Sequence, residues 1–245
     1  MKKLVSVLFL LMAFFSIFLL ASNIKERIKS HNVVNEIREI KSTTEKIETK
    51  KEAKKTTYQF SSYVFKENSQ TDLINAIEDY VGWVSIEDTN MDYPIVKAED
   101  NLFYLDHDFY KQENVAGAIF MDRRNLGNAF DQHTLIYGHN LKNGGMFTNL
   151  NLYLKEDFYN EHQEITFTDL YGASTYQVIS AYYVSADDFE LPFEVNETSV
   201  EAMISSSLFD SPYTYSVDDR FLTLSTCNYI LNNGRMVVHA VKVND

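Results

Sequence analysis

The 245-residue sequence is poor in the residues that mark several common classes of protein. It contains 1 cysteine, which excludes an internal disulfide framework and a cysteine-rich zinc or iron–sulfur site. Its 3 prolines and 8 glycines are too few for a collagen-like or proline-rich low-complexity chain. Cations are also scarce. The formal net charge is −13, so nucleic acid is not expected as a partner.

Apolar residues, by contrast, are plentiful. Hydrophobic residues make up 45% of the chain and aromatic residues 14%, which is enough to build a full core and excludes a mainly disordered protein. The length suits one ordinary domain with an appendage.

The charges divide the chain into two parts. Residues 1–57 carry 12 Lys or Arg and 6 Asp or Glu, whereas the rest carries 10 and 29. A basic appendage therefore precedes a strongly acidic body, in which each arginine merits separate attention.

The appendage opens with a long apolar run. Lys2 and Lys3 are followed by an uncharged segment, Leu4 to Ala21, that would reach about 27 Å as a helix, close to a hydrocarbon core of roughly 30 Å. A cleaved signal peptide is the alternative, but its apolar region usually spans only about 7–15 residues. We therefore predict that residues 1–21 form a single-pass membrane anchor. The two lysines indicate a cytoplasmic N-terminus, which would place the body outside the cell.

Residues 22–57 are polar, of mixed charge, and free of proline and glycine. A loose helical stripe of isoleucine and valine in their first half predicts a helical stalk that passes into a flexible tether. The alternative is a basic surface that touches anionic lipid headgroups.

The body, residues 58–245, is predicted to be mainly β. A helix is expected to start at Thr71, and further helical stretches are expected near 145–160 and 198–209. Short runs rich in β-branched and aromatic residues predict six strands. They are Ala118–Met121, Thr134–Tyr137, Glu164–Phe167, Thr175–Val184, Phe221–Thr226 and Met236–Val243. This pattern favours a β-barrel or sandwich with helical insertions.

The single thiol, Cys227, ends the strand-like run FLTLSTCNY. One interpretation is an inert core thiol, because free cysteine is among the most buried residue types. The other is a nucleophile presented at the rim of a barrel, and the strand-end position favours it.

A nucleophilic cysteine needs a histidine or cation that stabilises its thiolate. Among 6 histidines, His139 also follows a strand directly, in TLIYGHN, so we prefer it as the partner. His133 lies six residues earlier, and the two would not share one compact metal site. No metal and no cofactor is predicted.

Acyl-transfer chemistry also needs a donor for the developing oxyanion. Arg235 opens the final strand, eight residues after Cys227, and a short loop could bring both to one end of the barrel. The alternative is a surface arginine that pairs with the acidic body.

Together, TLSTC (Thr223–Cys227), Arg235 and YGHN (Tyr137–Asn140) resemble the Cys, His and Arg signature of the sortases, which are cysteine transpeptidases of Gram-positive bacteria. Three further segments are similar to class B sortases, and the resemblance covers about residues 70–243. They are GWVSIEDTNMDYPIV (Gly82–Val96), DNLFYLDHDF (Asp100–Phe109) and GAIFMDRRN (Gly117–Asn125).

The resemblance implies a sortase-type eight-stranded β-barrel with N-terminal helices and a helix between the sixth and seventh strands. It implies an extracellular catalytic domain over residues 58–245. Its substrates would be surface proteins that carry a C-terminal sorting signal of NPQTN or NPxTG type. The signal would be cleaved after its Thr, and the protein transferred to an amine of the cell-wall precursor lipid II. A pilin-polymerising sortase, with a pilin lysine as the amine, is the alternative.

Residue by residue, the resemblance implies that Cys227 is the nucleophile, His139 the acid and base, and Arg235 the group that binds the carbonyl oxygen or substrate backbone. It also implies that Asn101, Leu105 and Ser225 contact the sorting signal.

Two other classes remain open. A papain-like protease would place its Cys before its His in the chain, the reverse of the order here. A membrane-tethered adhesin or scaffold would keep Cys227 as an inert core residue.

Overall fold

A computed structural model describes residues 2–51, 58–60, 63–65, 70–127, 131–142, 144–185, 187, 191–228 and 233–243. The last part of the predicted tether, residues 52–57, lies outside them.

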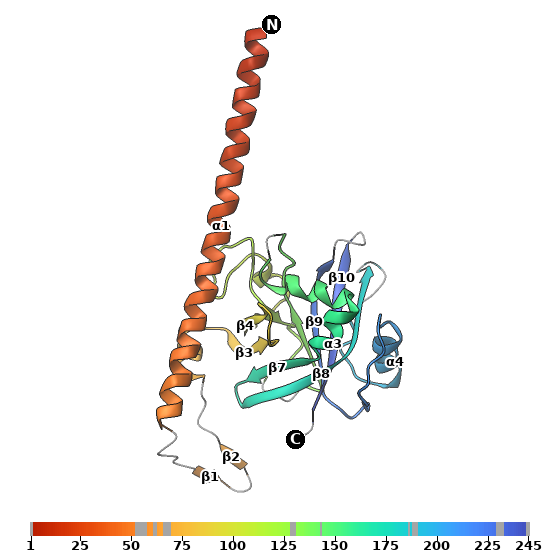
Figure 1. Ribbon diagram of the computed structural model, residues 1–245. Coiled ribbons are helices and arrows are strands. Elements are labelled where there is room, and N and C mark those ends of the chain that lie inside the picture. The colour runs from red at the N-terminus through yellow and green to blue at the C-terminus, as the bar shows by residue number, and fades with distance from the viewer. Residues whose placement is uncertain are drawn as a thin grey trace.

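Eight strands close into a barrel in the order β10-β8-β7-β3-β4-β5-β6-β9 (Figure 1). Most neighbours are antiparallel, but β4 pairs with β5 and β6 with β9 in parallel. The predicted eight-stranded barrel is thus confirmed. Its strands are β3 (Tyr80–Ser85), β4 (Asp92–Val96), β5 (Phe120–Met121), β6 (His133–Tyr137), β7 (Glu164–Asp169), β8 (Gly172–Ser185), β9 (Phe221–Asn228) and β10 (Gly234–Lys242). A separate two-stranded sheet pairs β1 (Tyr58–Phe60) with β2 (Tyr63–Phe65).

Helices precede and interrupt the barrel. They are α1 (Lys2–Lys51), α2 (Thr71–Ala76), the 3-10 helices η1 (Phe103–Leu105) and η2 (Phe147–Leu154), α3 (Glu156–Glu161) and α4 (Glu197–Ser205). Helix α4 begins with a capping box, in which the Asn196 side chain and Ser199 satisfy each other's backbone N–H groups. It lies between β8 and β9, the sixth and seventh barrel strands in chain order, as predicted.

The two faces of β9 and β10 pack against different partners. Leu222, Leu224 and Val238 belong to the main core. Phe221 and Val241, on the opposite face, pack with Val200 and Met203 of α4. Because side chains alternate along a strand, Thr223 and Ser225 share the α4-facing side of the barrel with Phe221.

The second half of α1 lies along β3 and β4, and its first half projects away from the barrel (Figure 1). Ile37 is fully buried in this contact. Arg38 Nε donates a hydrogen bond to the Asp92 carbonyl at 2.9 Å, and Lys41 Nζ lies 4.2 Å from the centroid of the Trp83 ring. These contacts fix one side of the helix to the barrel.

The described residues correct one prediction. None of their helices is both long enough and apolar enough to cross a membrane. On this finding the predicted single-pass location, with a cytoplasmic N-terminus and an extracellular catalytic domain, is wrong.

Candidate active site

The parallel pairing of β6 with β9 brings the predicted histidine and cysteine to the same end of the barrel. Tyr137 pairs with Ser225, and the Gly138 N–H donates to the Ser225 carbonyl at 3.2 Å. His139 and Cys227 each follow two residues later on adjacent chain segments. Residues 88 positions apart in the sequence therefore meet through strand register.

Arg235 is the residue of β10 directly opposite Cys227 in the β9–β10 ladder. The Cys227 backbone is part of β9, but its side chain lies outside the described part of the chain. The Arg235 guanidinium folds over the turn that precedes its strand: Nη1 donates to the Gly234 carbonyl at 3.1 Å and to Asn233 Oδ1 at 3.2 Å.

His139 is oriented by a backbone carbonyl. Its Nε2 lies 2.6 Å from the oxygen of Leu105, the last residue of η1. A carbonyl oxygen can only accept, so Nε2 must carry the proton, and Nδ1 is the ring nitrogen that can take up or release one. Gly117 (φ +59°) makes this approach possible, because a Cβ there would lie 2.9 Å from both His139 Cδ2 and the Leu105 oxygen.

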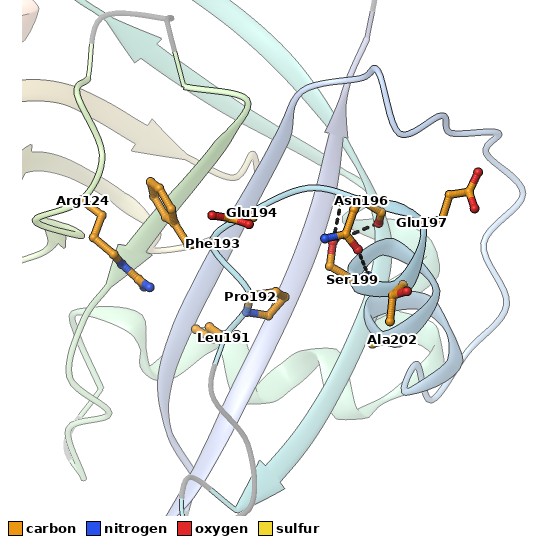
Figure 2. A pocket seen from close by; sticks show the side chains of 10 residues that line it. Arg124, Leu191, Pro192, Phe193, Glu194, Asn196, Glu197, Ser199 and Ala202 are labelled. Carbon is orange, nitrogen blue, oxygen red and sulfur yellow. Dashed lines mark hydrogen bonds between the residues drawn. The ribbon is translucent and has the colours of Figure 1, made fainter.

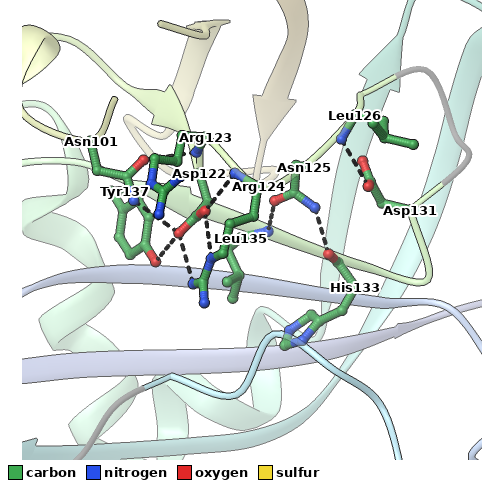
Figure 3. A network of polar contacts seen from close by, with 10 residues as sticks. All are labelled: Asn101, Asp122, Arg123, Arg124, Asn125, Leu126, Asp131, His133, Leu135 and Tyr137. Atoms are coloured by element: carbon green, nitrogen blue, oxygen red, sulfur yellow. Dashed lines mark hydrogen bonds and ion pairs between the residues drawn. The ribbon is translucent and has the colours of Figure 1, made fainter. Parts of the chain in front are cut away.

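Asn101 belongs to a polar network centred on Asp122 (Figure 3). Its Nδ2 donates to Asp122 Oδ2 at 3.0 Å, and its Oδ1 accepts from the Arg123 N–H at 2.8 Å. Tyr137, in the strand that leads to His139, donates its hydroxyl to the same Oδ2 at 2.8 Å. Arg124 completes the network: Nε donates to Oδ1 and Nη2 to Oδ2, each at 2.9 Å.

The Asp122 carboxylate is fully buried yet charged. Burial alone would raise its pKa. The hydrogen bonds from the Arg124 side chain, the Arg124 N–H and the Tyr137 hydroxyl outweigh burial and lower the pKa to about 2. The network therefore keeps its charge over the whole physiological range of pH.

Arg124 also faces an open cavity of about 1110 Å³, which is lined mainly by the β8–α4 connection and the first turns of α4 (Figure 2). Its guanidinium carbon lies 4.7 Å from the centroid of the Phe193 ring. Leu191 and Pro192 line the cavity beside Phe193, and Glu194 and Glu197 add negative charge.

A buried chain of hydrogen bonds crosses four strands on the α4-facing side of the barrel. Thr223 Oγ1 lies 2.6 Å from His133 Nε2 and 2.6 Å from His239 Nδ1, and His239 Nε2 lies 3.0 Å from the Tyr182 hydroxyl. We call these four side chains the Thr223 chain. Both histidines contribute to the framework of β6, β9, β10 and β8 and lie away from the barrel end that carries residues 139 and 227.

The structure thus brings residues 139, 227 and 235 and the Leu105 carbonyl to one end of the barrel. Asn101 is linked to β6 through Asp122, which also accepts a hydrogen bond from Tyr137. Among the predicted residues whose side chains are described, Ser225 is the most buried, at 3% exposure. Sequence reasoning missed Asp122 and Arg124, although the segment GAIFMDRRN holds both. The scarcity of cations in the body was the available signal for Arg124.

Comparisons with known proteins agree with this arrangement. The sortase domain family matches residues 84–243. Sortase B of Listeria monocytogenes is 38% identical over 176 residues, which are 68% of this chain and 71% of the relative. The chain therefore belongs to the sortase family, and it is a cysteine transpeptidase of cell-wall sorting.

Within the family it is a class B sortase. The crystal structure of Clostridium perfringens sortase B matches with a TM-score of 0.67 at 34% identity, over 71% of this chain and 100% of that one. A Staphylococcus aureus sortase B–substrate complex matches with a TM-score of 0.75 at 27% identity, over 90% and 99%.

Proposed function

We propose that this sortase cleaves an NPQTN- or NPxTG-like sorting signal after its Thr and transfers the protein to an amine of a peptidoglycan precursor such as lipid II. Residues 58–245 would be the catalytic domain, and residues 22–57 the stalk that precedes it. The substrates would be surface proteins that carry this signal at their C-terminus.

In this proposal Cys227 is the nucleophile. Its thiolate attacks the Thr carbonyl carbon, the peptide bond breaks, and a thioester forms. The departing amine takes its proton from His139. The acceptor amine then attacks the thioester, His139 recovers a proton, and the Cys227 thiolate leaves. Protons and electrons balance over the cycle, so no cofactor is required.

The Leu105 carbonyl supports the acid and base role of His139. Because Nε2–H is held by that oxygen, the exchangeable proton is confined to Nδ1. A backbone group thus performs the orienting task that a carboxylate performs in a Ser-His-Asp triad.

Arg235 would stabilise the oxyanion of the tetrahedral intermediate or hold the substrate backbone. Its position opposite residue 227 supports this role, because paired positions in an antiparallel ladder share a face of the sheet.

The observation that carries the proposal is the convergence of positions 139, 227 and 235 on one end of the barrel. Its test mixes the full chain with a panel of sorting-signal peptides and follows intact-protein mass. We expect an adduct on Cys227 equal to the peptide cut after Thr. Cys227→Ala serves as the control that forms none.

Two results would contradict the proposal. One is an adduct at another residue. The other is a Cys227 that alkylates readily but forms no adduct with any peptide of the panel, even with an amine acceptor present.

A further inference from the structure

The Asp122 network joins three separate segments of the chain that the proposed substrate site involves. Asn101 lies just before η1, which holds His139 through the Leu105 carbonyl. Tyr137 belongs to β6, and Arg124 to the wall of the cavity. All three side chains converge on one buried carboxylate (Figure 3).

Both oxygens of the Asp122 carboxylate accept more than one hydrogen bond. Oδ1 accepts from the Arg124 N–H and Nε at 2.9 Å each, and Oδ2 accepts from Asn101 Nδ2, Arg124 Nη2 and the Tyr137 hydroxyl at 3.0, 2.9 and 2.8 Å. Every group around Asp122 is a donor, so only an ionised carboxylate satisfies all of them. An amide would turn its NH₂ toward at least two of these donors.

Asp122 does not reach the reacting atoms through any of these bonds. Its bonds instead fix the rotamers of Asn101 and of Arg124, which lines the cavity. The Asn101 amide is held at both ends, by Asp122 and by the Arg123 N–H. The bonds to Asp122 also hold the Arg124 guanidinium where it stacks on the Phe193 ring, which belongs to the β8–α4 connection.

We propose that Asp122 is a positioning residue for binding of the sorting signal. It holds the Asn101 amide on one side of the peptide site and the Arg124–Phe193 contact on the other. The inference rests on the proposed function, because it takes Asn101 to be a peptide contact. Asp122 therefore controls peptide affinity and leaves the chemistry at Cys227 to other residues.

The test compares Asp122→Asn with the unmodified full chain in peptide cleavage. We expect KM to rise by about 10-fold or more while kcat changes by less than about threefold, the pattern of lost binding before the chemical step. Active sites are counted by alkylation of Cys227, so that unfolded molecules do not enter the rates. If Asp122 has a purely structural role, Asp122→Asn would lower the melting temperature and leave KM unchanged. That result would overturn the proposal.

A double-mutant cycle sharpens the test. If Asp122 acts through Asn101, Asn101→Ala and the double variant raise KM to a similar extent, because the second change finds the contact already lost. Additive increases in KM would show that Asp122 acts by another route.

Should Asp122→Asn fail to fold, Tyr137→Phe replaces it in the same cycle. This change removes one donor to Oδ2 and keeps the ring. A smaller rise in KM, again non-additive with Asn101→Ala, is expected, and an unchanged KM overturns the proposal. Failure of the proposed function is distinguishable, because the unmodified chain would then form no Cys227 adduct with any peptide.

Discussion

The contact between His139 and the Leu105 carbonyl leaves no room for a methyl group at Gly117. Gly117→Ala would place a Cβ 2.5 Å from the Tyr104 oxygen and 2.9 Å from both His139 Cδ2 and the Leu105 oxygen. We expect kcat for peptide cleavage to fall by about 100-fold, because a shift near 1 Å at a catalytic base can cost that much.

The strained backbone at Gly117 adds a loss of stability of about 1 kcal/mol or more. Gly127→Ala is the matched control. Gly127 also has a positive φ, +74°, but a Cβ there would meet only Met121 Sδ at 3.9 Å. Equal losses of kcat per folded molecule in both variants would show that backbone strain, and not the position of His139, limits the reaction.

Arg235 offers a second test at single-residue scale. Arg235→Lys keeps the charge but loses the planar set of donors, so the rate of thioester formation should fall by about 100-fold, as for loss of an oxyanion donor. Single-turnover mass spectrometry of the Cys227 adduct measures this rate. Alkylation of Cys227 by a small reagent should keep its rate within about threefold, since that reaction makes no oxyanion. A normal rate of adduct formation would remove Arg235 from the chemistry.

At the scale of the strands, the Thr223 chain ties β6, β9, β10 and β8 together beneath the site. Thr223→Val keeps the shape of the side chain but removes the hydroxyl that bonds His133 Nε2 and His239 Nδ1. We expect a loss of about 2–4 kcal/mol in the free energy of unfolding, measured with denaturant. Thr223→Ser restores the hydroxyl and should recover most of the loss. Equal stability of the Val and Ser variants would show that the hydroxyl contributes little.

The same chain predicts how stability depends on pH. Burial lowers the pKa of His133 to about 4. The pKa of His239 lies well below its ordinary value, because the ring is buried and because the nearby His133 disfavours a second positive charge. Asp122 and Arg124 also act on His133, in opposite directions. Each histidine is therefore neutral in the folded protein and gains a proton more readily when unfolded.

Stability should be full above about pH 6.5 and fall as pH drops toward 4, by about 1.4 kcal/mol per pH unit for each histidine. Denaturant unfolding between pH 7 and 4.5 measures the slope, and His239→Gln should reduce it. An unchanged slope in that variant would contradict the assignment.

The sequence predicted six of the barrel strands because their β-branched and aromatic runs were uninterrupted. Strands β3 and β4 were not found by pattern, since Gly82 and Pro94 break the runs, and only the family resemblance pointed to their segment. The strand-end positions of Cys227 and His139 could be predicted, because Cys227 lies near the end of one clear strand and His139 follows another. The Leu105 carbonyl could not, since a backbone oxygen has no signature in a sequence and its use depends on the path of η1. The Asp122 network was missed for a related reason: its donors come from positions 101, 124 and 137, which only the fold brings together.

At the scale of the whole molecule, α1 docks on the side of the barrel away from Cys227 and Arg235, and its Lys29 Nζ also donates a hydrogen bond to the Glu113 carbonyl at 2.8 Å. In the closed strand order, the β3–β4 pair that holds α1 lies across from the β9–β10 pair that carries Cys227 and Arg235. Docking of the helix should therefore contribute to stability without affecting the chemistry.

Ile37→Asp tests this separation. Ile37 is fully buried between α1 and the barrel, and an unpaired carboxylate there should release the helix. The single tryptophan of the chain, Trp83, is buried under Lys41 of α1, so its fluorescence should shift to longer wavelength as water reaches the ring. Ile28→Asp is the matched control, because Ile28 is 55% exposed on the same helix and should leave the emission unchanged. Peptide cleavage by Ile37→Asp should stay within about twofold of the unmodified chain, because the β3–β4 pair lies across the barrel from Cys227 and Arg235. A red shift accompanied by loss of cleavage would show that the docked helix supports the site through the barrel wall.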